Sequence, residues 1–264
     1  MPTDHPSIRI IRPAPCRAGD ILPLVSSLCD PPPYPAHIIH GPLPVLPVGT
    51  VLGGDAVRFQ VAGRAFLPGV THACPLARAW ADCPPAGDSP AEALCLPVSR
   101  EGWAVAVITL SDKGFAGQRQ DFSGPAVRDA LRAALPLCHE QAFVLPDEPA
   151  ALRALALELA VGQGYDLIVS TGGTGLSPRD LTPEALTPVL DRRVPGLEQA
   201  MMRASLSKTP RAALSRALAG TVGSCLVLAL PGSARAAAEN LAAVLPALPH
   251  ALAKLAGDPA DCGG

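Results

Sequence analysis

The sequence lacks the features that mark several large classes of protein. No run of like charges occurs, and 21 Lys and Arg nearly balance 23 Asp and Glu, for a formal net charge of -2. The chain therefore has no basic stripe for nucleic acid or anionic lipid. No stretch approaches the roughly 18 apolar residues of a membrane span, and the N-terminal segment has no apolar signal core. We expect a soluble cytoplasmic protein with no nucleic-acid or membrane partner.

Metal-binding and dinucleotide-binding signatures are missing too. None of the eight cysteines forms a C-x-x-C pair, which argues against a structural zinc site. Disulfide frameworks are typical of small exported chains, so without an export signal we expect reduced thiols. The G-x-G-x-x-G fingerprint and the P-loop lysine motif are also absent, which argues against NAD-dependent oxidoreduction.

The features that are present divide the chain near residue 100. The first 100 residues hold 18 of the 31 prolines, whereas all three lysines follow them. A segment rich in Pro, Gly and Ser runs from Asp82 to Ser99, as expected of a linker. The length suits one full domain with a smaller attachment. We predict a small β-rich module over residues 1–98 and a compact domain over residues 99–264.

Beyond the boundary, apolar runs of strand length alternate with segments of helical periodicity. Strands are expected at 104–110, 141–146, 166–171 and 225–230. Helices are expected at 124–135, 149–164, 182–191 and, as one or two helices, 234–257. Thr182 is the expected N-cap of the third helix. Strands that are apolar throughout need cover on both faces. The alternation therefore predicts an α/β fold, a three-layer α/β/α domain with a mostly parallel sheet.

Polar residues gather where these strands end. The first strand runs into "LSDKG", the second into "LPDEP", the third into "STGGTGLSPRD" and the last into "LPGS". Ligands of such folds bind at the carboxyl ends of the strands. Gly172, Gly173 and Gly175 would let backbone N–H groups converge on a phosphate or carboxylate. The alternative is a tight turn that happens to be polar.

Three aspartates in these loops point to a cation. Asp112, Asp147 and Asp180 could each be a cap or a turn former. However, carboxylates beside phosphate-binding amides repel an anionic ligand unless a cation bridges them. Their convergence at one sheet edge predicts Mg²⁺ and phosphoryl or nucleotidyl transfer.

Together these motifs resemble the molybdopterin adenylyltransferase (MogA/MoaB) family over residues 103–257. The matching motifs are "ITLSDKGFAGQRQDFSGPAV", "LPDE", "STGGTGLSPRDLTPEA", "VPGLE", "ALSR" and "LVLALPGSARAAAENLAAVLPALPHAL". The resemblance implies a domain that assembles as a homotrimer and transfers AMP from Mg-ATP to the terminal phosphate of molybdopterin, releasing pyrophosphate. It also implies Mg²⁺ as cofactor, ATP and molybdopterin as substrates, and a molybdenum insertase as the downstream partner.

The resemblance also assigns residues. The family's two key aspartates fall on Asp147 and Asp180, which would hold Mg²⁺ and align the α-phosphorus for in-line attack. Its ligand loops fall on Ser111, Asp112, Gly172, Gly173, Thr174, Gly175, Ser215, Arg216, Pro231, Gly232 and Ser233. The attacking phosphate oxygen is ionised at neutral pH, so no strong general base is required.

One helix departs from the family pattern. After the Pro-Gly pair, members commonly have a Glu followed by Met-Arg, and those positions are Gln199, Met201 and Met202 here. Glu198 and Arg203 are each displaced by one residue, which is about 100° around a helix. The change is either a tolerated swap or a loss of turnover. The second reading leaves a non-catalytic carrier that binds molybdopterin or the molybdenum cofactor as the alternative function.

The N-terminal module has a weaker resemblance. "VGTVLGGDAVRFQV" alternates like a strand pair, and "VTHACPLARAW" follows it, an order similar to the latter part of MOSC domains. Those domains bind molybdenum cofactor or its sulfur through a cysteine, which would be Cys74 here, with His72 nearby. The alternative is a degenerate module in which Cys74 is a small buried apolar residue.

Overall fold

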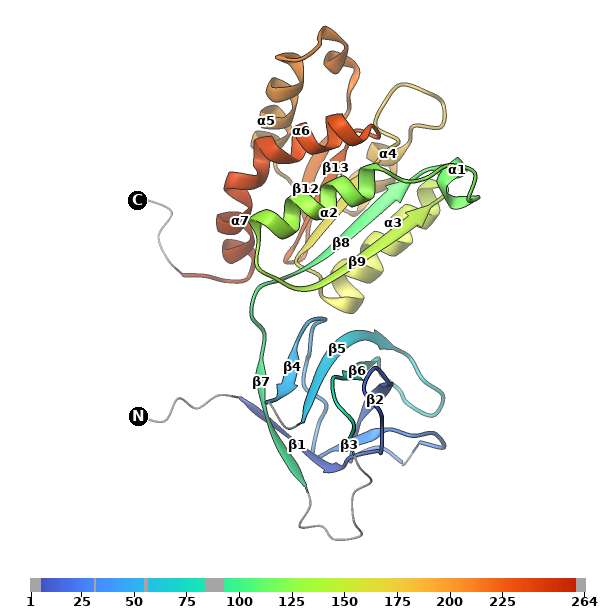
Figure 1. The fold of residues 1–264 in the computed structure, drawn as a ribbon, viewed down its shortest axis with the longest axis vertical. Helices are drawn as coiled ribbons and strands as arrows, with labels where there is room; N and C mark the ends of the chain where they lie inside the picture. The colour runs from blue at the N-terminus through green and yellow to red at the C-terminus, as the bar shows by residue number, and fades with distance from the viewer. Residues whose placement is uncertain (1–5, 31, 55–56, 84–92, 260–264) are drawn as a thin grey trace. The chain divides into compact units, whose positions relative to one another are not determined.

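The structure, a computed structural model, describes residues 6–30, 32–54, 57–83 and 93–259. The chain divides into two compact units, unit 1 at Met1–Glu101 and unit 2 at Gly102–Gly264, which Figure 1 shows in colours that follow the chain. The division falls shortly after the predicted boundary, because the last strand of unit 1 continues to Ser99. Cys262 and residues 84–92 of the proline-rich segment lie outside the described residues.

Unit 1 folds as a closed β-barrel with the strand order β1-β3-β2-β6-β5-β4-β7. Its strands are β1 Ser7–Arg12, β2 Ile21–Ser26, β3 His37–Ile39, β4 Val51–Gly53, β5 Arg58–Ala65, β6 Cys74–Ala79 and β7 Leu94–Ser99. Apolar side chains from several strands fill the interior, among them Ile10, Leu24 and Phe59. The predicted strand pair is the antiparallel pair β4–β5. The module predicted to be β-rich is therefore a barrel.

Cys74 begins β6 and has no exposed surface. It packs with Val25 and Ala36. Burial, and then the neighbouring Cys29, raises the pKa of the Cys74 thiol, and the positive charge of Arg64 opposes that rise. The burial agrees with the reading of Cys74 as a small apolar residue, and the MOSC resemblance stays a prediction.

Unit 2 is built around a mixed sheet with the order β11-β12-β13-β10-β8-β9. Its strands are β8 Trp103–Leu110, β9 Leu137–Leu145, β10 Leu167–Thr171, β11 Arg192–Arg193, β12 Leu218–Val222 and β13 Cys225–Leu230. The strands β13, β10, β8 and β9 run parallel. This part of the sheet follows from the predicted alternation of strands and helices.

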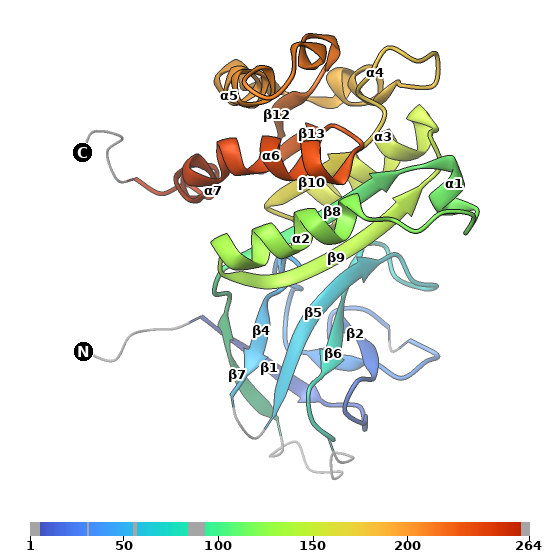
Figure 2. The ribbon, with the colours of Figure 1, turned by 45° about the horizontal axis from the view of Figure 1, so that its top comes forward.

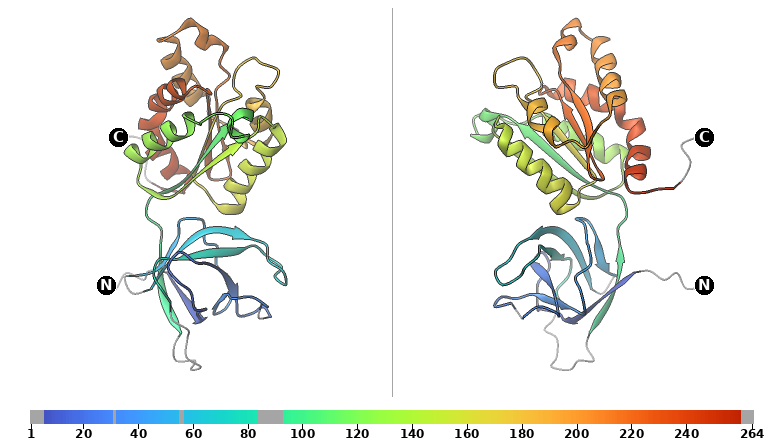
Figure 3. Two further views of the ribbon diagram at one scale, coloured as in Figure 1. Left: turned by 45° about the vertical axis from the view of Figure 1, so that its right-hand side comes forward. Right: turned by 180° about the vertical axis from the view of Figure 1, so that it is seen from behind.

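Helices cover both faces of this sheet. They are α1 Asp112–Phe115, α2 Ser123–Ala134, α3 Pro149–Leu157, α4 Thr182–Leu186, α5 Pro195–Leu206, α6 Ala234–Val244 and α7 Leu248–Leu255. On one face, α2, α6 and α7 share a core with Val105 and Val107 of β8, while Figures 2 and 3 show α3 on the other face. Within the described ranges, the helices are too short or too polar to cross a membrane.

The sheet departs from the prediction at one edge. Strand β12 pairs antiparallel with β13, and β11 pairs antiparallel with β12. Val222 and Cys225 are partners in the ladder, so only Gly223 and one further residue connect the two strands. Such a short connection joins only antiparallel neighbours, and Gly223 provides the positive φ of +56° that the turn uses. The mostly parallel sheet is thus confirmed for its four parallel strands and corrected at the edge formed by β12 and β11.

Thr182 also differs from its predicted role. It is the first residue of α4 rather than the cap, and its hydroxyl donates to the carbonyl oxygen of Gly172 at 2.8 Å. Because α4 ends at Leu186, the helix is shorter than predicted. The Thr182 side chain therefore stabilises the loop that follows β10, at Gly172, and does not cap the helix.

Candidate active site

The four parallel strands of unit 2 bring their following loops to one edge of the sheet. The strand order places the loop after β10 between the loops after β13 and β8. Two open clefts lie among these loops. They share Gly173, Asp180 and Gly232, so Asp180 lies where the two clefts meet.

The first cleft has a volume of about 520 Å³ and is rich in carboxylates. Asp121, Asp147 and Asp180 all line it, and Arg119 adds a positive charge. These residues come from the loops after three different strands. Two of the three aspartates predicted at the strand ends, Asp147 and Asp180, therefore line one cleft, and Asp121 lines it in addition, while Asp112 does not.

The second cleft has a volume of about 420 Å³ and a different character. Lys208 and Arg211, which follow α5, line it together with Thr174 and Ser215. Neither cation has an ion pair within the described part of the chain, and the Ser215 hydroxyl is buried there without a hydrogen-bond partner. These groups can receive an anionic ligand.

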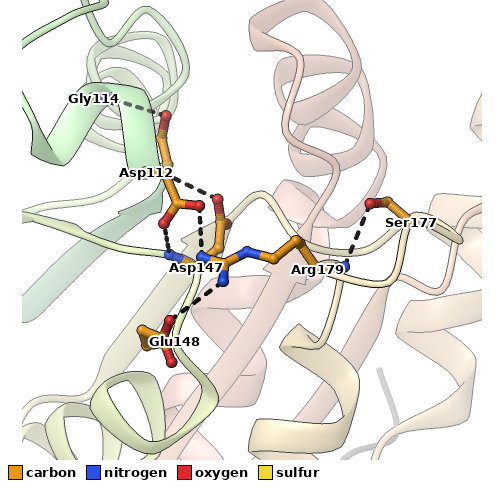
Figure 4. A network of polar contacts seen from close by, with 7 residues as sticks. Asp112, Gly114, Asp147, Glu148, Ser177 and Arg179 are labelled. Carbon is orange, nitrogen blue, oxygen red and sulfur yellow. Dashed lines mark hydrogen bonds and ion pairs between the residues drawn. The ribbon is translucent and has the colours of Figure 1, made fainter.

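Asp112 and Asp147 hold two neighbouring loops together, as Figure 4 shows. The backbone N–H of Asp112 donates to Asp147 Oδ2 at 3.1 Å, and the N–H of Asp147 donates to Asp112 Oδ1 at 3.0 Å. Arg179 then donates to Asp112 Oδ2 at 2.6 Å and to Glu148 at 3.4 Å. This clasp ties the loops after β8, β9 and β10 to one another.

The clasp affects the two carboxyl groups in opposite directions. The hydrogen bond from the Asp147 N–H, helped by Arg179, keeps the pKa of Asp112 below its ordinary value. Burial raises the pKa of Asp147, and the negative charges of Asp112 and Asp180 add to the rise, while the bond from the Asp112 N–H opposes it. A partly buried carboxylate beside like charges favours a bound cation.

Two glycines after β10 are required by the backbone. Gly172 has φ +104°, and a Cβ there would lie 2.5 Å from the carbonyl oxygen of Leu110. Gly173 has φ +63°, and a Cβ there would clash with the Thr182 hydroxyl. Only glycine avoids both problems. The loop thus passes close to β8 and to α4, and leaves its backbone beside both clefts.

Arg216 holds the part of this loop between Gly175 and Asp180 in place. Its guanidinium donates to the carbonyl oxygen of Gly175 at 2.9 Å and also to the carbonyl oxygen of Asp180. It pairs in addition with the Glu184 carboxylate. Arg216 is therefore occupied with shaping the loop, rather than lining a cleft.

Asp121 is one of the cleft residues that sequence reasoning missed, together with Lys208 and Arg211 of the second cleft. Its carboxylate accepts hydrogen bonds from the Thr109 hydroxyl at 2.7 Å, from the N–H and hydroxyl of Ser123, and from the N–H of Gly124. Burial alone would raise the pKa of Asp121, but these bonds leave it below the ordinary value. The signal was available in "QDFSG", where an Asp precedes Ser-Gly at the start of a helix.

The structure brings most of the predicted site residues together. The following line one or both clefts: Ser111, Asp147, Gly172, Gly173, Thr174, Gly175, Asp180, Ser215, Pro231, Gly232 and Ser233. Asp112 and Arg216 instead hold the loops in place. The hydroxyls of Ser111 and Ser233 accept bonds from N–H groups of α1 and α6, so they cap helices as well as facing the first cleft.

The altered positions of helix α5 do not line either cleft, although Ser205 near the end of the helix lines the second. Gln199 is exposed, Met201 is buried and Met202 is half-buried, and none of them lines a cleft. Glu198 accepts two bonds from Arg193 at 2.8 and 2.7 Å and one from a backbone N–H of β12 at 3.0 Å. The displaced Glu198 therefore fastens α5 to the antiparallel edge of the sheet.

Comparison with known proteins places this architecture in a family. Residues 106–250 match the family described as probable molybdopterin binding domain. The chain is 42% identical over 153 residues to a molybdenum cofactor biosynthesis bifunctional protein of Chlorobaculum tepidum, which covers 58% of this chain and 48% of that protein. It is 35% identical over 156 residues to the molybdopterin adenylyltransferase of Helicobacter pylori strain J99, with 58% of this chain and 88% of that protein covered.

A solved structure agrees with these matches. The molybdopterin biosynthesis enzyme MoaB of Thermus thermophilus is 48% identical, with a TM-score of 0.55, over 60% of this chain and 98% of that one. The chain spans about half the length of the bifunctional relative. The family match lies within unit 2 and includes all four strand-end loops that form the clefts. The resemblance drawn from the motifs is confirmed, and the chain belongs to the molybdopterin-binding domain family.

Proposed function

We propose that the chain transfers AMP from Mg-ATP to the terminal phosphate of molybdopterin, giving adenylyl-molybdopterin and pyrophosphate. The observation that supports this most is the position of Asp180 between a carboxylate-rich cleft and a cleft lined by Lys208 and Arg211. Two anionic substrates and a bridging cation need such adjoining sites. The name of the Helicobacter pylori relative, molybdopterin adenylyltransferase, supports the same reaction.

The loop after β10 is suited to hold phosphate groups. Gly173 and Gly175 expose backbone beside the clefts, and Lys208 and Arg211 bring positive charge to the second cleft. Phosphate oxygens accept strongly from such donors. Because Arg216 and Thr182 hold the loop in place, little ordering is needed when a ligand binds.

Asp147 and Asp180 fit a magnesium ion that enters with ATP. Within the described residues no group of three or more side chains forms a ready metal site. Magnesium, however, usually takes one or two carboxylates together with substrate phosphates and waters. In each of these aspartates, Oδ2 accepts a backbone N–H and leaves Oδ1 open. The ion would neutralise phosphate charge between the two substrates.

The remaining steps require little proton transfer. The attacking molybdopterin phosphate is ionised at neutral pH, so the chain need only align it with the α-phosphorus of ATP. Donors of the second cleft and the glycine loop would stabilise charge on the departing pyrophosphate. The location of the reaction at the junction of the clefts gives Asp180 the central position.

The alternative function, a carrier without turnover, rested on the altered helix and on the extra N-terminal segment. Gln199, Met201 and Met202 lie away from both clefts, and the four strand-end loops retain the residues assigned to chemistry. The enzyme is therefore the function that the geometry favours.

The two functions differ in one assay. The purified chain is mixed with Mg-ATP, with and without molybdopterin, and pyrophosphate release is measured. Release that depends on molybdopterin is the result expected of the enzyme. Saturable binding of molybdopterin with no release above the ATP-only control would instead identify a carrier.

The wider setting is part of the same proposal. The product would pass to a molybdenum insertase, because adenylylation primes molybdopterin for metal insertion. The name of the Chlorobaculum tepidum relative, molybdenum cofactor biosynthesis bifunctional protein, is consistent with two steps of one pathway. Assembly as a homotrimer and a cytoplasmic location stay predictions. Sedimentation of the purified chain in solution would test the first of these.

A further inference from the structure

Two cysteines of unit 1 face each other across an isolated β-bridge. Cys16 lies between β1 and β2, and Cys83 lies after β6. The N–H of Cys16 donates to the Cys83 carbonyl oxygen at 3.0 Å, and the N–H of Cys83 donates to the Cys16 carbonyl oxygen at 2.7 Å. Residues paired in this way have Cα atoms about 5.5 Å apart, which lies within the usual range for a disulfide.

The two cysteine side chains lie on one face of the bridge. Residues directly opposite each other in an antiparallel pair point their side chains to the same side, and both cysteines are nearly buried, with 8% of Cys16 and 6% of Cys83 exposed. A bond between the two sulfurs therefore needs a local adjustment of the side chains and not a rearrangement of the backbone.

Further hydrogen bonds hold the two segments in register. The N–H of Ala18 donates to Asp82 Oδ1 at 2.8 Å, and the N–H of Gly19 donates to the Ala79 carbonyl oxygen at 2.8 Å. The N–H of Ala79 donates to the Asp20 carbonyl oxygen at 2.9 Å. Because these bonds lie directly beside the pair, on the side that leads to β2 and β6, they keep the two cysteines opposite each other and give the two sulfurs a high effective concentration for each other.

Small reagents can reach the pair. An open cleft of about 510 Å³ is lined by Pro15, Cys16, Arg17, Asp20, Asp82 and Cys83. It belongs entirely to unit 1 and is separate from the two clefts of unit 2. Both cysteines line this cleft, so a small disulfide or a reductant has access to them.

We propose that Cys16 and Cys83 form a reversible redox site that closes to an intramolecular disulfide. With oxidised glutathione as oxidant, the thiolate of one cysteine attacks the glutathione disulfide, whose S–S bond breaks to release one glutathione. The other cysteine loses its proton and attacks the protein sulfur of the mixed disulfide, releasing the second glutathione. Two protein thiols are oxidised, and one small disulfide is reduced to two thiols.

The surroundings of the pair make this exchange slow at neutral pH. Burial, and then the neighbouring Cys83, raises the pKa of Cys16 to about 11, while burial also raises that of Cys83. Since the thiolate is the nucleophile, the rate of closure should increase as the pH rises from 7 towards 9. Once formed, the bond ties the connection between β1 and β2 to the end of β6.

The test uses the full chain in buffers with graded ratios of reduced to oxidised glutathione. Peptide mapping by mass spectrometry identifies the linked peptides, and circular dichroism checks that the protein stays folded. A peptide pair joining Cys16 to Cys83 should appear at a more reducing ratio than any other link. The midpoint temperature for thermal unfolding of unit 1 should then rise by several degrees, and it should fall back when the disulfide is reduced.

Two variants separate this site from general oxidation. Cys16→Ser should abolish both the link and the thermal shift, whereas Cys95→Ser, at an exposed position, should leave both intact. A folded wild-type chain that shows no such link under the most oxidising buffer would overturn the proposal. So would a link of Cys29 to Cys74 that forms first.

Discussion

Asp147 combines a place in the proposed active site with an environment that is unfavourable for its charge. Burial and the charges of Asp112 and Asp180 raise the pKa of its carboxyl group in the folded chain above the value of 3.8 of an unperturbed aspartate. The folded state therefore binds the proton more tightly than the unfolded state, and stability falls as the pH rises through the window between the two pKa values. At neutral pH the charge of Asp147 opposes folding.

This argument predicts the effect of Asp147→Asn on stability. The amide keeps an acceptor for the Asp112 N–H but removes the charge, so the variant should be at least as stable as wild type at pH 7. The difference should shrink as the pH falls towards 4. Urea unfolding at both pH values measures it, with Asp129→Asn on the exposed side of α2 as control. A variant clearly less stable than wild type at pH 7 would contradict the burial argument.

Single residues also show what a sequence can and cannot reveal. Asp147 and Asp180 could be found because they follow strands, and strand ends meet at one edge. The pattern "QDFSG" marks Asp121 as a residue at a helix start, but its bond to Thr109 could not be predicted, and neither could the contact of Arg179 with Asp112, because both depend on loop geometry. A loop residue's partners are set by tertiary structure, which periodicity does not describe.

Among the structural elements, the loop after β10 is the most constrained. Gly172 combines a φ of +104° with a close approach to the Leu110 carbonyl oxygen. Gly223, in the hairpin between β12 and β13, also has a positive φ, but a Cβ there would meet nothing within 4 Å. Both glycines have a positive φ, but only Gly172 lacks the space for a Cβ atom.

The pair makes a matched test. Gly223→Ala should cost about 1 kcal/mol through backbone strain alone. Gly172→Ala adds a steric clash and should cost about 3 kcal/mol or more in the free energy of unfolding, because the loop must also move away from β8. Chemical denaturation of both variants gives the comparison. Equal losses in the two variants would show that the approach to β8 is not constrained.

Elements also differ in how well the sequence predicted them. The parallel strands β8, β10 and β13 are largely apolar runs between helical segments, so their type was accessible from the sequence. Strand β9 begins at Leu137 and was predicted only from residue 141, because its first half contains His139 and Glu140. Strand β12 was missed, because "LAGTV" contains a glycine and is weakly apolar. Its identity as a strand follows from pairing with β13, which local pattern alone does not indicate.

At the scale of the whole molecule, the chain joins a family domain to a separate barrel. The barrel contains His37, which is fully buried. Its Nδ1 accepts the N–H of Ala14 at 3.1 Å, so the neutral ring carries its proton on Nε2, which has no partner among the described residues. Burial lowers the pKa of His37 to about 4 from 6.5. The unfolded chain therefore binds a proton more readily than the barrel does.

The barrel should accordingly lose stability in acid. The contribution of the neutral His37 to the stability of the barrel is fully present above about pH 6.5. It is lost as the pH drops towards 4, by about 3 kcal/mol in total. Trp80 lies in unit 1 and Trp103 in unit 2, so Trp103→Phe leaves Trp80 fluorescence as a reporter of the barrel. His37→Gln in that background should flatten the pH dependence between 4 and 6.5. An unchanged slope would exclude His37 as the cause.

The measurement that tests the central claim is pyrophosphate release from Mg-ATP in the presence of molybdopterin, compared between wild type, Asp180→Asn and Asp129→Asn. Asp180 lies where the two clefts meet, while Asp129 lies on the exposed side of α2. Loss of a group that stabilises the transition state typically costs 100-fold or more, at roughly 3 kcal/mol. The account predicts molybdopterin-dependent release by wild type and Asp129→Asn, and a rate about 100-fold lower for folded Asp180→Asn. Equal rates for all three proteins would contradict it.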